Sequence, residues 1–126
     1  MATMIKFRAW DKATSSYRKV LEIEFYPDGE LKKVKVAGLQ RKGTITPDKL
    51  VLEQFTGLTD VNGKDIYEGD IVKVTSQYWG MLGNKYEVKF KQGAFYVKYG
   101  LLSEISPSIS VIGNVHTNPE LLEGHE

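Results

Sequence analysis

The densest group of oxygen-bearing side chains in the sequence lies between residues 60 and 70. Asp60, Asn62, Asp65, Glu68 and Asp70 occur there around two glycines. Carboxylate and amide oxygens are ligands for hard cations, and the segment faintly resembles the start of a calcium loop. It lacks the twelve-residue frame of such a loop, and consecutive tight turns also require Asp, Asn and Gly. We therefore interpret the segment as two turns and predict no metal site.

Groups for nucleophilic catalysis are sparse. Such catalysis needs a nucleophile, a base and an orienting group. The two histidines are His116, expected at the surface after a strand, and His125, close to the terminus. The glycines within residues 79–83 lack the Lys and Ser/Thr of a phosphate-binding loop. We therefore expect a protein that is not an enzyme and uses no cofactor, and an enzyme is only the second rival of the binding functions below.

Aromatic residues are concentrated in the second half of the chain, where small β-barrels that bind single strands place exposed rings between basic residues. Lysines alternate with aromatic residues there, at Lys89, Phe90, Lys91, Tyr96 and Lys98. Three of the aromatic side chains, Phe90, Phe95 and Tyr99, are expected to fill the core. We predict that the exposed rings are those of Tyr78, Trp79 and Tyr96.

Exposed tyrosine and tryptophan side chains also anchor protein interfaces. The leading functional hypothesis is therefore a protein–protein interaction, either self-association as a homo-oligomer or binding of an unknown protein partner. The predicted partner-binding residues are the aromatic anchors and two basic residues at their rim: Trp10, Tyr78, Trp79, Tyr96, Arg41 and Lys42.

The first rival hypothesis is nucleic-acid binding by the basic half of the chain. Residues 1–58 contain 11 basic and 7 acidic residues, whereas residues 59–126 contain 6 and 9, so the net charges are +4 and −3. A basic half suits an acidic partner. The residues assigned to this alternative are Lys32, Lys33, Lys35, Arg41 and Lys42.

The secondary-structure elements that position these residues are predicted from the alternation of apolar and polar residues. This alternation has a period of two, which is the period of a strand. In the first half, residues 5–10, 21–25 and 33–36 alternate in this way. Residues 27–29 (PDG) form a turn signal between the second and third of these segments. A two-residue turn would pair Glu24 with Lys33, Glu22 with Lys35, Ile23 with Val34 and Leu21 with Val36. A three-residue loop would shift this register, so the sequence favours the shorter turn.

The second half contains about five short strands, predicted near residues 50–55, 71–74, 86–90, 95–99 and 110–115. Turns are expected at residues 62–63 (NG), 68–69 (EG) and 92–93 (QG), while residues 38–49 and 76–84 are read as loops, the former with a short strand at most. Asn118, Pro119 and Glu120 have the residue types that begin a helix. The expected fold is mainly all-β: an N-terminal β-hairpin region over residues 1–55, packed on a small, nearly closed barrel over residues 56–126 with a short C-terminal helix.

Neither the cysteine content nor the hydropathy pattern indicates export or membrane insertion. The chain has no cysteine, its first residues do not combine a basic start with an apolar run, and no window approaches the roughly 20 apolar residues of a membrane span. We therefore predict a cytoplasmic protein without a membrane partner.

Three blocks of sequence resemble the YopX family of phage and prophage proteins. The central block is QFTGLTDVNGKDIYEGDIV at residues 54–72, the opening block is IKFRAWD at residues 5–11, and the closing blocks are VIGNV at 111–115 and NPELL at 118–122. The resemblance implies that the C-terminal barrel, of five strands, is SH3-like. It also implies a phage or prophage accessory protein working in the cytoplasm of a Gram-positive host. It implies no catalytic residue, because no activity is established for that family.

Overall fold

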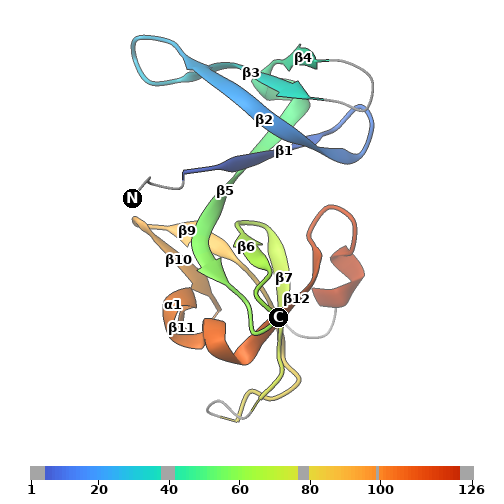
Figure 1. Ribbon diagram of the computed structural model, residues 1–126, viewed down its shortest axis with the longest axis vertical. Coiled ribbons are helices and arrows are strands. Elements are labelled where there is room, and N and C mark those ends of the chain that lie inside the picture. Colours follow the sequence, from blue (N-terminus) through green and yellow to red (C-terminus); the bar gives the residue numbers. More distant parts are fainter. Residues whose placement is uncertain (1–4, 38–41, 77–79, 99, 123–126) are drawn as a thin grey trace. The chain divides into compact units, whose positions relative to one another are not determined.

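The chain folds into antiparallel β-strands joined by tight turns, so the expected mainly-β class is confirmed (Figure 1). The computed structural model describes residues 5–37, 42–76, 80–98 and 100–122. Two compact units make up the chain, residues 1–54 and residues 55–126. The division predicted from the sequence lies one residue later, between residues 55 and 56.

The first unit is an antiparallel sheet with the strand order β4-β3-β2-β1-β5. Its strands are β1 (Phe7–Asp11), β2 (Ser16–Phe25), β3 (Leu31–Ala37), β4 (Lys42–Ile45) and the first half of β5 (Leu50–Thr59), with the 3₁₀ turn η1 (Pro47–Lys49) before β5. One face of the sheet carries the buried residues Ala9, Val34, Val36 and Leu50, against which Leu31, Ile45 and other partly buried residues pack. Strand β4 lies inside the segment read as a loop with a short strand at most.

The β2–β3 hairpin keeps the predicted pairing but reaches it through a different turn. Glu22 pairs with Lys35, Ile23 with Val34 and Glu24 with Lys33, as predicted. The two-residue turn is wrong, because the Tyr26 N–H donates to the Glu30 carbonyl across a three-residue loop.

A bulge restores the register after this longer loop. Phe25 pairs with Leu31 while Glu24 pairs with Lys33, so Lys32 is the extra residue. A second irregularity places Val20, and not Leu21, opposite Val36. The predicted Leu21–Val36 pair is therefore wrong, and the Leu21 side chain is partly exposed.

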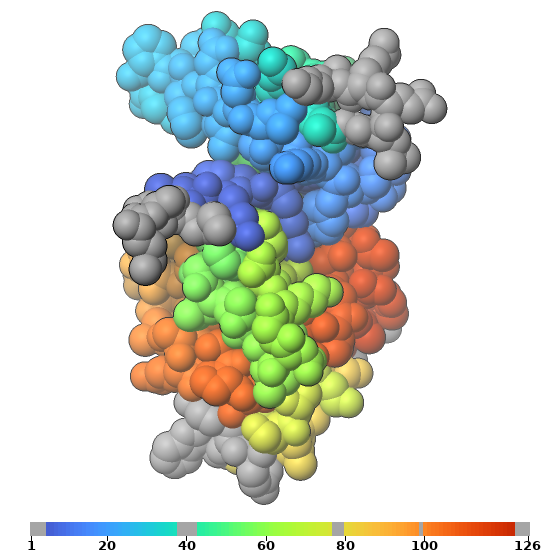
Figure 2. Space-filling view, viewed as in Figure 1, coloured from blue at the N-terminus to red at the C-terminus, as the bar shows by residue number. Residues whose placement is uncertain are grey.

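Strand β5 continues from the first unit into the second, where Phe55 and Thr59 pair with β6 (Asp65–Tyr67). The rest of the second unit is built from two three-stranded sheets, in the orders β12-β7-β8 and β11-β10-β9. Their strands are β7 (Asp70–Val74), β8 (Lys85–Glu87), β9 (Lys89–Lys91), β10 (Ala94–Val97), β11 (Gly100–Leu101) and β12 (Ile109–Asn114). In the space-filling view this unit is coloured green to red (Figure 2).

The core of the second unit is larger than that of the first. Its buried residues are Ile66, Val72, Val74, Tyr86, Val88, Val97, Leu102, Ile105 and Ile109. Phe95 packs against this core as predicted, whereas Phe90, predicted to fill it, is 46% exposed. Tyr99 lies outside the described residues.

The predicted strand at residues 86–90 is divided at Val88, which ends β8 and precedes β9. The Val88 N–H donates to the Asp70 carbonyl, and its own carbonyl accepts the Gly69 N–H, each at 2.9 Å. Strands β8 and β9 consequently belong to different sheets. The described strands form no closed barrel, so the SH3-like barrel is not confirmed.

Helical segments in the second unit are short. The expected C-terminal helix is the 3₁₀ turn η3 (Pro119–Leu122), where the Leu121 N–H donates to the Asn118 carbonyl at 3.0 Å. An unpredicted helix, α1 (Leu102–Ile105), runs into the 3₁₀ turn η2 (Ser106–Ser108). Leu102 and Ile105 are three residues apart and both are buried, so α1 packs one face against the core of the second unit. In the described ranges no helix is long and apolar enough to cross a membrane.

Candidate functional site

The carboxylate of Asp60 stabilises a turn by accepting hydrogen bonds from backbone groups. Its Oδ1 accepts the N–H groups of Asn62 at 2.8 Å and Lys64 at 2.9 Å, and its Oδ2 accepts the N–H of Val111 at 2.8 Å. Burial raises the pKa of Asp60, but these backbone hydrogen bonds and the charge of Lys64 outweigh burial and bring the pKa below its ordinary value of 3.8.

The second acid of this segment follows the same pattern. The buried Asp70 accepts the Tyr67 N–H at 2.8 Å through its Oδ2, which holds the turn before β7. These contacts support the interpretation of the acidic segment as turns. The described residues contain no group of three or more histidine, cysteine or acidic side chains arranged to hold a metal ion.

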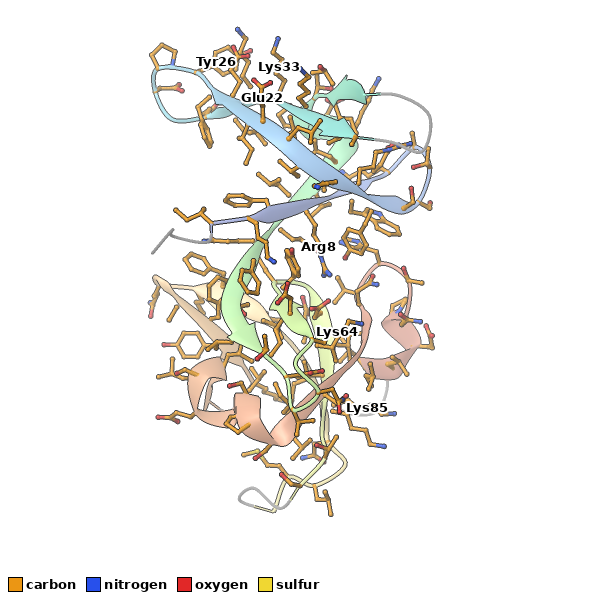
Figure 3. All side chains as sticks on the ribbon, in the orientation of Figure 1. Arg8, Glu22, Tyr26, Lys33, Lys64 and Lys85 are labelled. Carbon is orange, nitrogen blue, oxygen red and sulfur yellow. The ribbon has the colours of Figure 1, made fainter. Side chains whose placement is uncertain are left out.

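The lysines assigned to nucleic-acid binding on β3 lie beside glutamates of β2. The Glu24 carboxylate is 3.0 Å from the Lys32 ammonium and 3.6 Å from that of Lys33, and Glu22 is 3.4 Å from Lys35. The hydrogen bond between Lys32 and Glu24 lowers the pKa of Glu24 and raises that of Lys32. Figure 3 labels Glu22 and Lys33 on this hairpin.

On this outer face of the hairpin, each of the three lysines therefore has an acidic neighbour. A hollow of about 280 Å³ is lined there by Glu22, Glu24, Lys33, Lys35 and Thr44, with two acids and two bases. Of the remaining residues of this alternative, Arg41 lies outside the described residues. Lys42 begins β4, where its backbone pairs with Ala37 of β3, and its side chain is not described.

Of the predicted aromatic anchors of a protein interface, the structure describes Trp10 in the first unit and Tyr96 in the second. Trp10 is partly buried, and its ring meets that of Tyr17 edge-on, with centroids 5.0 Å apart. Tyr17 in turn donates its hydroxyl to Glu53 at 2.9 Å, and Glu53 also accepts the Arg8 guanidinium at 2.8 Å. Tyr78 and Trp79 lie outside the described residues.

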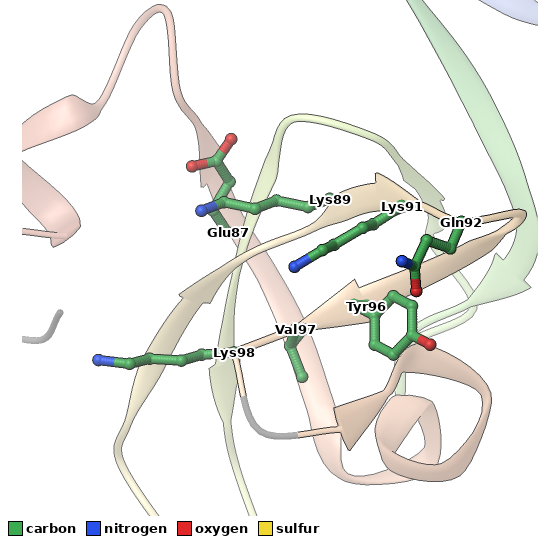
Figure 4. A pocket seen from close by; sticks show the side chains of 7 residues that line it. All are labelled: Glu87, Lys89, Lys91, Gln92, Tyr96, Val97 and Lys98. Carbon is green, nitrogen blue, oxygen red and sulfur yellow. The ribbon is translucent and has the colours of Figure 1, made fainter.

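Tyr96, the remaining predicted residue, lines a pocket rich in lysine. The pocket has a volume of about 490 Å³ and lies beside the β9–β10 hairpin (Figure 4). Its lining residues are Glu87, Lys89, Lys91, Gln92, Tyr96, Val97 and Lys98. In the sequence the three lysines lie close to aromatic residues, but neither set of predicted binding residues included them.

The hairpin itself explains why these side chains share one face. Lys89 lies directly opposite Tyr96, and Lys91 lies opposite Ala94, so all four side chains project to the same side of the two strands. Phe90 and Phe95 pair on the other side, with ring centroids 4.9 Å apart. The tight turn at Gln92 and Gly93, with φ angles of +52° and +80°, fixes this register.

The lining is cationic, because its only carboxylate is that of Glu87 while three of its side chains are lysines. Lys89 and Lys91 are both exposed. Among the residues that the structure describes, neither forms an ion pair, in contrast to the lysines of β3. A concave surface lined by one sign of charge concentrates ligands of the opposite sign. The pocket is thus suited to an anionic ligand.

Comparison of the sequence with models of known protein families identifies the family of this chain. The model of the YopX protein family matches residues 6–123, which is nearly the entire chain. The chain belongs to the YopX family. The resemblance seen in the sequence blocks is thereby confirmed.

Two known proteins are similar to this chain. The SPbeta prophage-derived uncharacterized protein YopX of Bacillus subtilis (strain 168) is 40% identical over 74 residues, which are 51% of this chain. The chain spans only about half of that relative, 54% of its length. The crystal structure of protein EF1440 from Enterococcus faecalis superposes with a TM-score of 0.71 at 25% identity, and the match covers 97% of this chain and 100% of that one.

Proposed function

We propose that this YopX-family protein is a non-catalytic binding protein that takes a nucleic acid into the lysine-lined pocket of its second unit. The observation that carries the proposal is that Lys89, Lys91 and Lys98 line one hollow that has a single carboxylate, Glu87. Phosphate groups along a nucleic acid are the polyanion that such a lysine cluster attracts, and their contacts supply most sequence-independent affinity. The working compartment that fits this role is the cytoplasm of a bacterial host, since the named relative is prophage-derived.

A titration with salt tests the proposal. We expect a fluorescently labelled oligonucleotide to bind at 50 mM salt and to dissociate progressively by 200 mM, because each phosphate contact releases counterions. The double variant Lys89→Gln/Lys91→Gln should lower the affinity about tenfold or more. It should also reduce the slope of log K against log salt by about 1.4 for a single strand, the value for two lost contacts.

A matched control uses the paired lysines of the first unit. Lys33→Gln/Lys35→Gln removes the same formal charge, but from side chains that lie beside Glu24 and Glu22. This variant should leave the salt slope unchanged. Equal losses in the two double variants would show that only net charge matters, and the absence of any binding at low salt would exclude the proposed function.

A protein partner is the second candidate, and the tip of the β2–β3 hairpin supports it. Phe25 and Tyr26 are 57% and 49% exposed, and the Lys32 ammonium lies 5.7 Å from the Tyr26 ring centroid. Adjacent exposed aromatic side chains are typical anchors of protein interfaces. Self-association or binding through this tip would respond little to salt, so the same titration separates the two candidates.

A further inference from the structure

We propose that the pocket selects single-stranded nucleic acid, with one base stacked on the ring of Tyr96 and consecutive phosphates on Lys89 and Lys91. This inference rests on the proposed function and deepens it. It assigns separate tasks to the ring and to the lysines, which an ordinary polyanion site would not need. The tasks can therefore be measured separately.

The position of Tyr96 gives the ring its task. Tyr96 faces Lys89 directly across the hairpin, and side chains paired in this way have Cβ atoms about 5 Å apart. Figure 4 shows the ring at the edge of the hollow beside Lys91 and Gln92. Within the described ranges, the Tyr96 ring stacks on no other ring and its hydroxyl makes no hydrogen bond. A half-buried ring of this kind offers a flat surface to a planar base.

The spacing of the lysines suits a strand of phosphates. Lys89 and Lys91 are two residues apart on β9, so their Cα atoms are separated by roughly 6.6 Å along the strand. Neighbouring phosphates of an extended single strand have a comparable separation. Ala94, opposite Lys91, has a side chain too small to cover the space between that lysine and the ring.

The size and form of the pocket argue against a duplex. A hollow of about 490 Å³ holds a group of nucleotide size, which is also within the usual range for small-ligand pockets. The bases of a duplex are stacked on one another and present no free face, so a duplex could use the lysines but not Tyr96. Of these two forms of nucleic acid, the unpaired strand is the one that brings a phosphate and an open base face to the hairpin together.

The test compares three probes of matched phosphate number with the full chain at 50 mM salt. They are an oligothymidylate of about 12 nucleotides, the same strand with all bases removed, and a duplex with the same total number of phosphates. We expect the oligothymidylate to bind roughly tenfold more tightly than the abasic strand, as one stacked base would give. The duplex should bind no better than the abasic strand.

Two variants assign the base preference to Tyr96. Tyr96→Leu should lose the preference for the base-containing strand while keeping its affinity for the abasic one, and Tyr96→Phe should keep both. Circular dichroism checks that each variant is folded, and the comparison of probes on the unaltered protein stands even where a variant is not. Equal binding of the oligothymidylate and abasic strands would overturn this inference but leave the proposed function intact. Failure of all three probes to bind would overturn both.

Discussion

Asp60 shows how one carboxylate can have a structural task that resembles a functional one in the sequence. It is 6% exposed, and three backbone N–H groups point at its two oxygens. Replacing it with alanine would leave these donors without a partner in a largely buried place. We expect Asp60→Ala to lower the free energy of unfolding by about 3 kcal/mol, measured by urea denaturation. Asp28→Ala is the control, because Asp28 is exposed and accepts a single N–H, that of Glu30, and it should cost less than about 1 kcal/mol.

The same carboxylate makes stability depend on acid. Because the pKa of Asp60 in the folded protein lies below 3.8, its contribution is complete above that value and is lost as the pH falls through the lower folded-state pKa. We expect the unfolding midpoint to decline below pH 4 in the unaltered protein and to decline less in Asp60→Asn, which cannot ionise. Identical acid profiles for the two proteins would contradict the assigned hydrogen bonds.

The sequence predicted the turn at Asp60 and the register that pairs Glu24 with Lys33 and Glu22 with Lys35, but it did not show that Lys89 and Lys91 lack such acidic partners across the hairpin. The nucleic-acid hypothesis assigned five basic residues of the N-terminal half to binding. The β2–β3 pairing puts Glu22 and Glu24 beside three of them. Lys89 and Lys91 carry the same charge but have no acid directly across the hairpin, because their cross-strand partners are Tyr96 and Ala94. Knowledge of a residue's partner, and not of its type, separates a charged site from a balanced surface.

At the scale of elements, the β2–β3 hairpin combines a three-residue loop with a bulge at Lys32, and Gly29 is the residue that permits the loop. Its φ angle is +93°, a region that side chains with a Cβ atom rarely adopt. Gly29→Ala should therefore destabilise the first unit by about 1–2 kcal/mol, although no atom lies within 4 Å of the added methyl group.

Gly43 provides the matched control for backbone strain. It lies in β4 of the same sheet, and a methyl group added there would also meet no atom within 4 Å, but its φ angle is not positive. Gly43→Ala should be neutral or slightly stabilising in urea denaturation, since alanine loses less conformational freedom on folding than glycine. If both substitutions gave equal losses, the cost at Gly29 would not come from its φ angle.

Alternation predicted most strands, and the exceptions have physical causes. The period of two continues through residues 86–90, so no pattern marks the change of sheet at Val88. That break is fixed by hydrogen bonds to Gly69 and Asp70, which are distant in the sequence. The length of the hairpin loop was mispredicted because a bulge can compensate for one extra loop residue. The strand pairing beyond the bulge is then the same as for the shorter loop, so the alternation of side chains does not distinguish the two.

At the scale of the whole molecule, the sequence predicted the class and the family correctly, but the described strands do not form the nearly closed barrel that it also predicted. The expected barrel followed from the number and spacing of strands, which two separate three-stranded sheets satisfy equally well. The pocket depends on the same partition, because Glu87 comes from β8 while Lys89 and Tyr96 come from β9 and β10. The continuous strand that the sequence predicted over residues 86–90 therefore gave no indication of this pocket.

The two cores have no buried residue in common, which leads to a prediction about cooperativity. The described residues give the first unit four core positions, whereas the second unit has nine. Val34 and Val74 are each fully buried, one in each core. Val34→Ala removes two methyl groups' worth of packing from the smaller core, at a cost of about 2 kcal/mol.

Native-state hydrogen exchange distinguishes local from global effects of this substitution. We expect Val34→Ala to accelerate exchange of the β2 and β3 amides by roughly 30-fold, the factor that corresponds to about 2 kcal/mol, and to leave the β7 amides unchanged. Val74→Ala is the reciprocal variant and should accelerate β7 while sparing β3. Because the two clusters share no buried residue, we expect the smaller core to open without the larger. Equal acceleration of both sets by either variant would instead mean that the chain unfolds as one cooperative body.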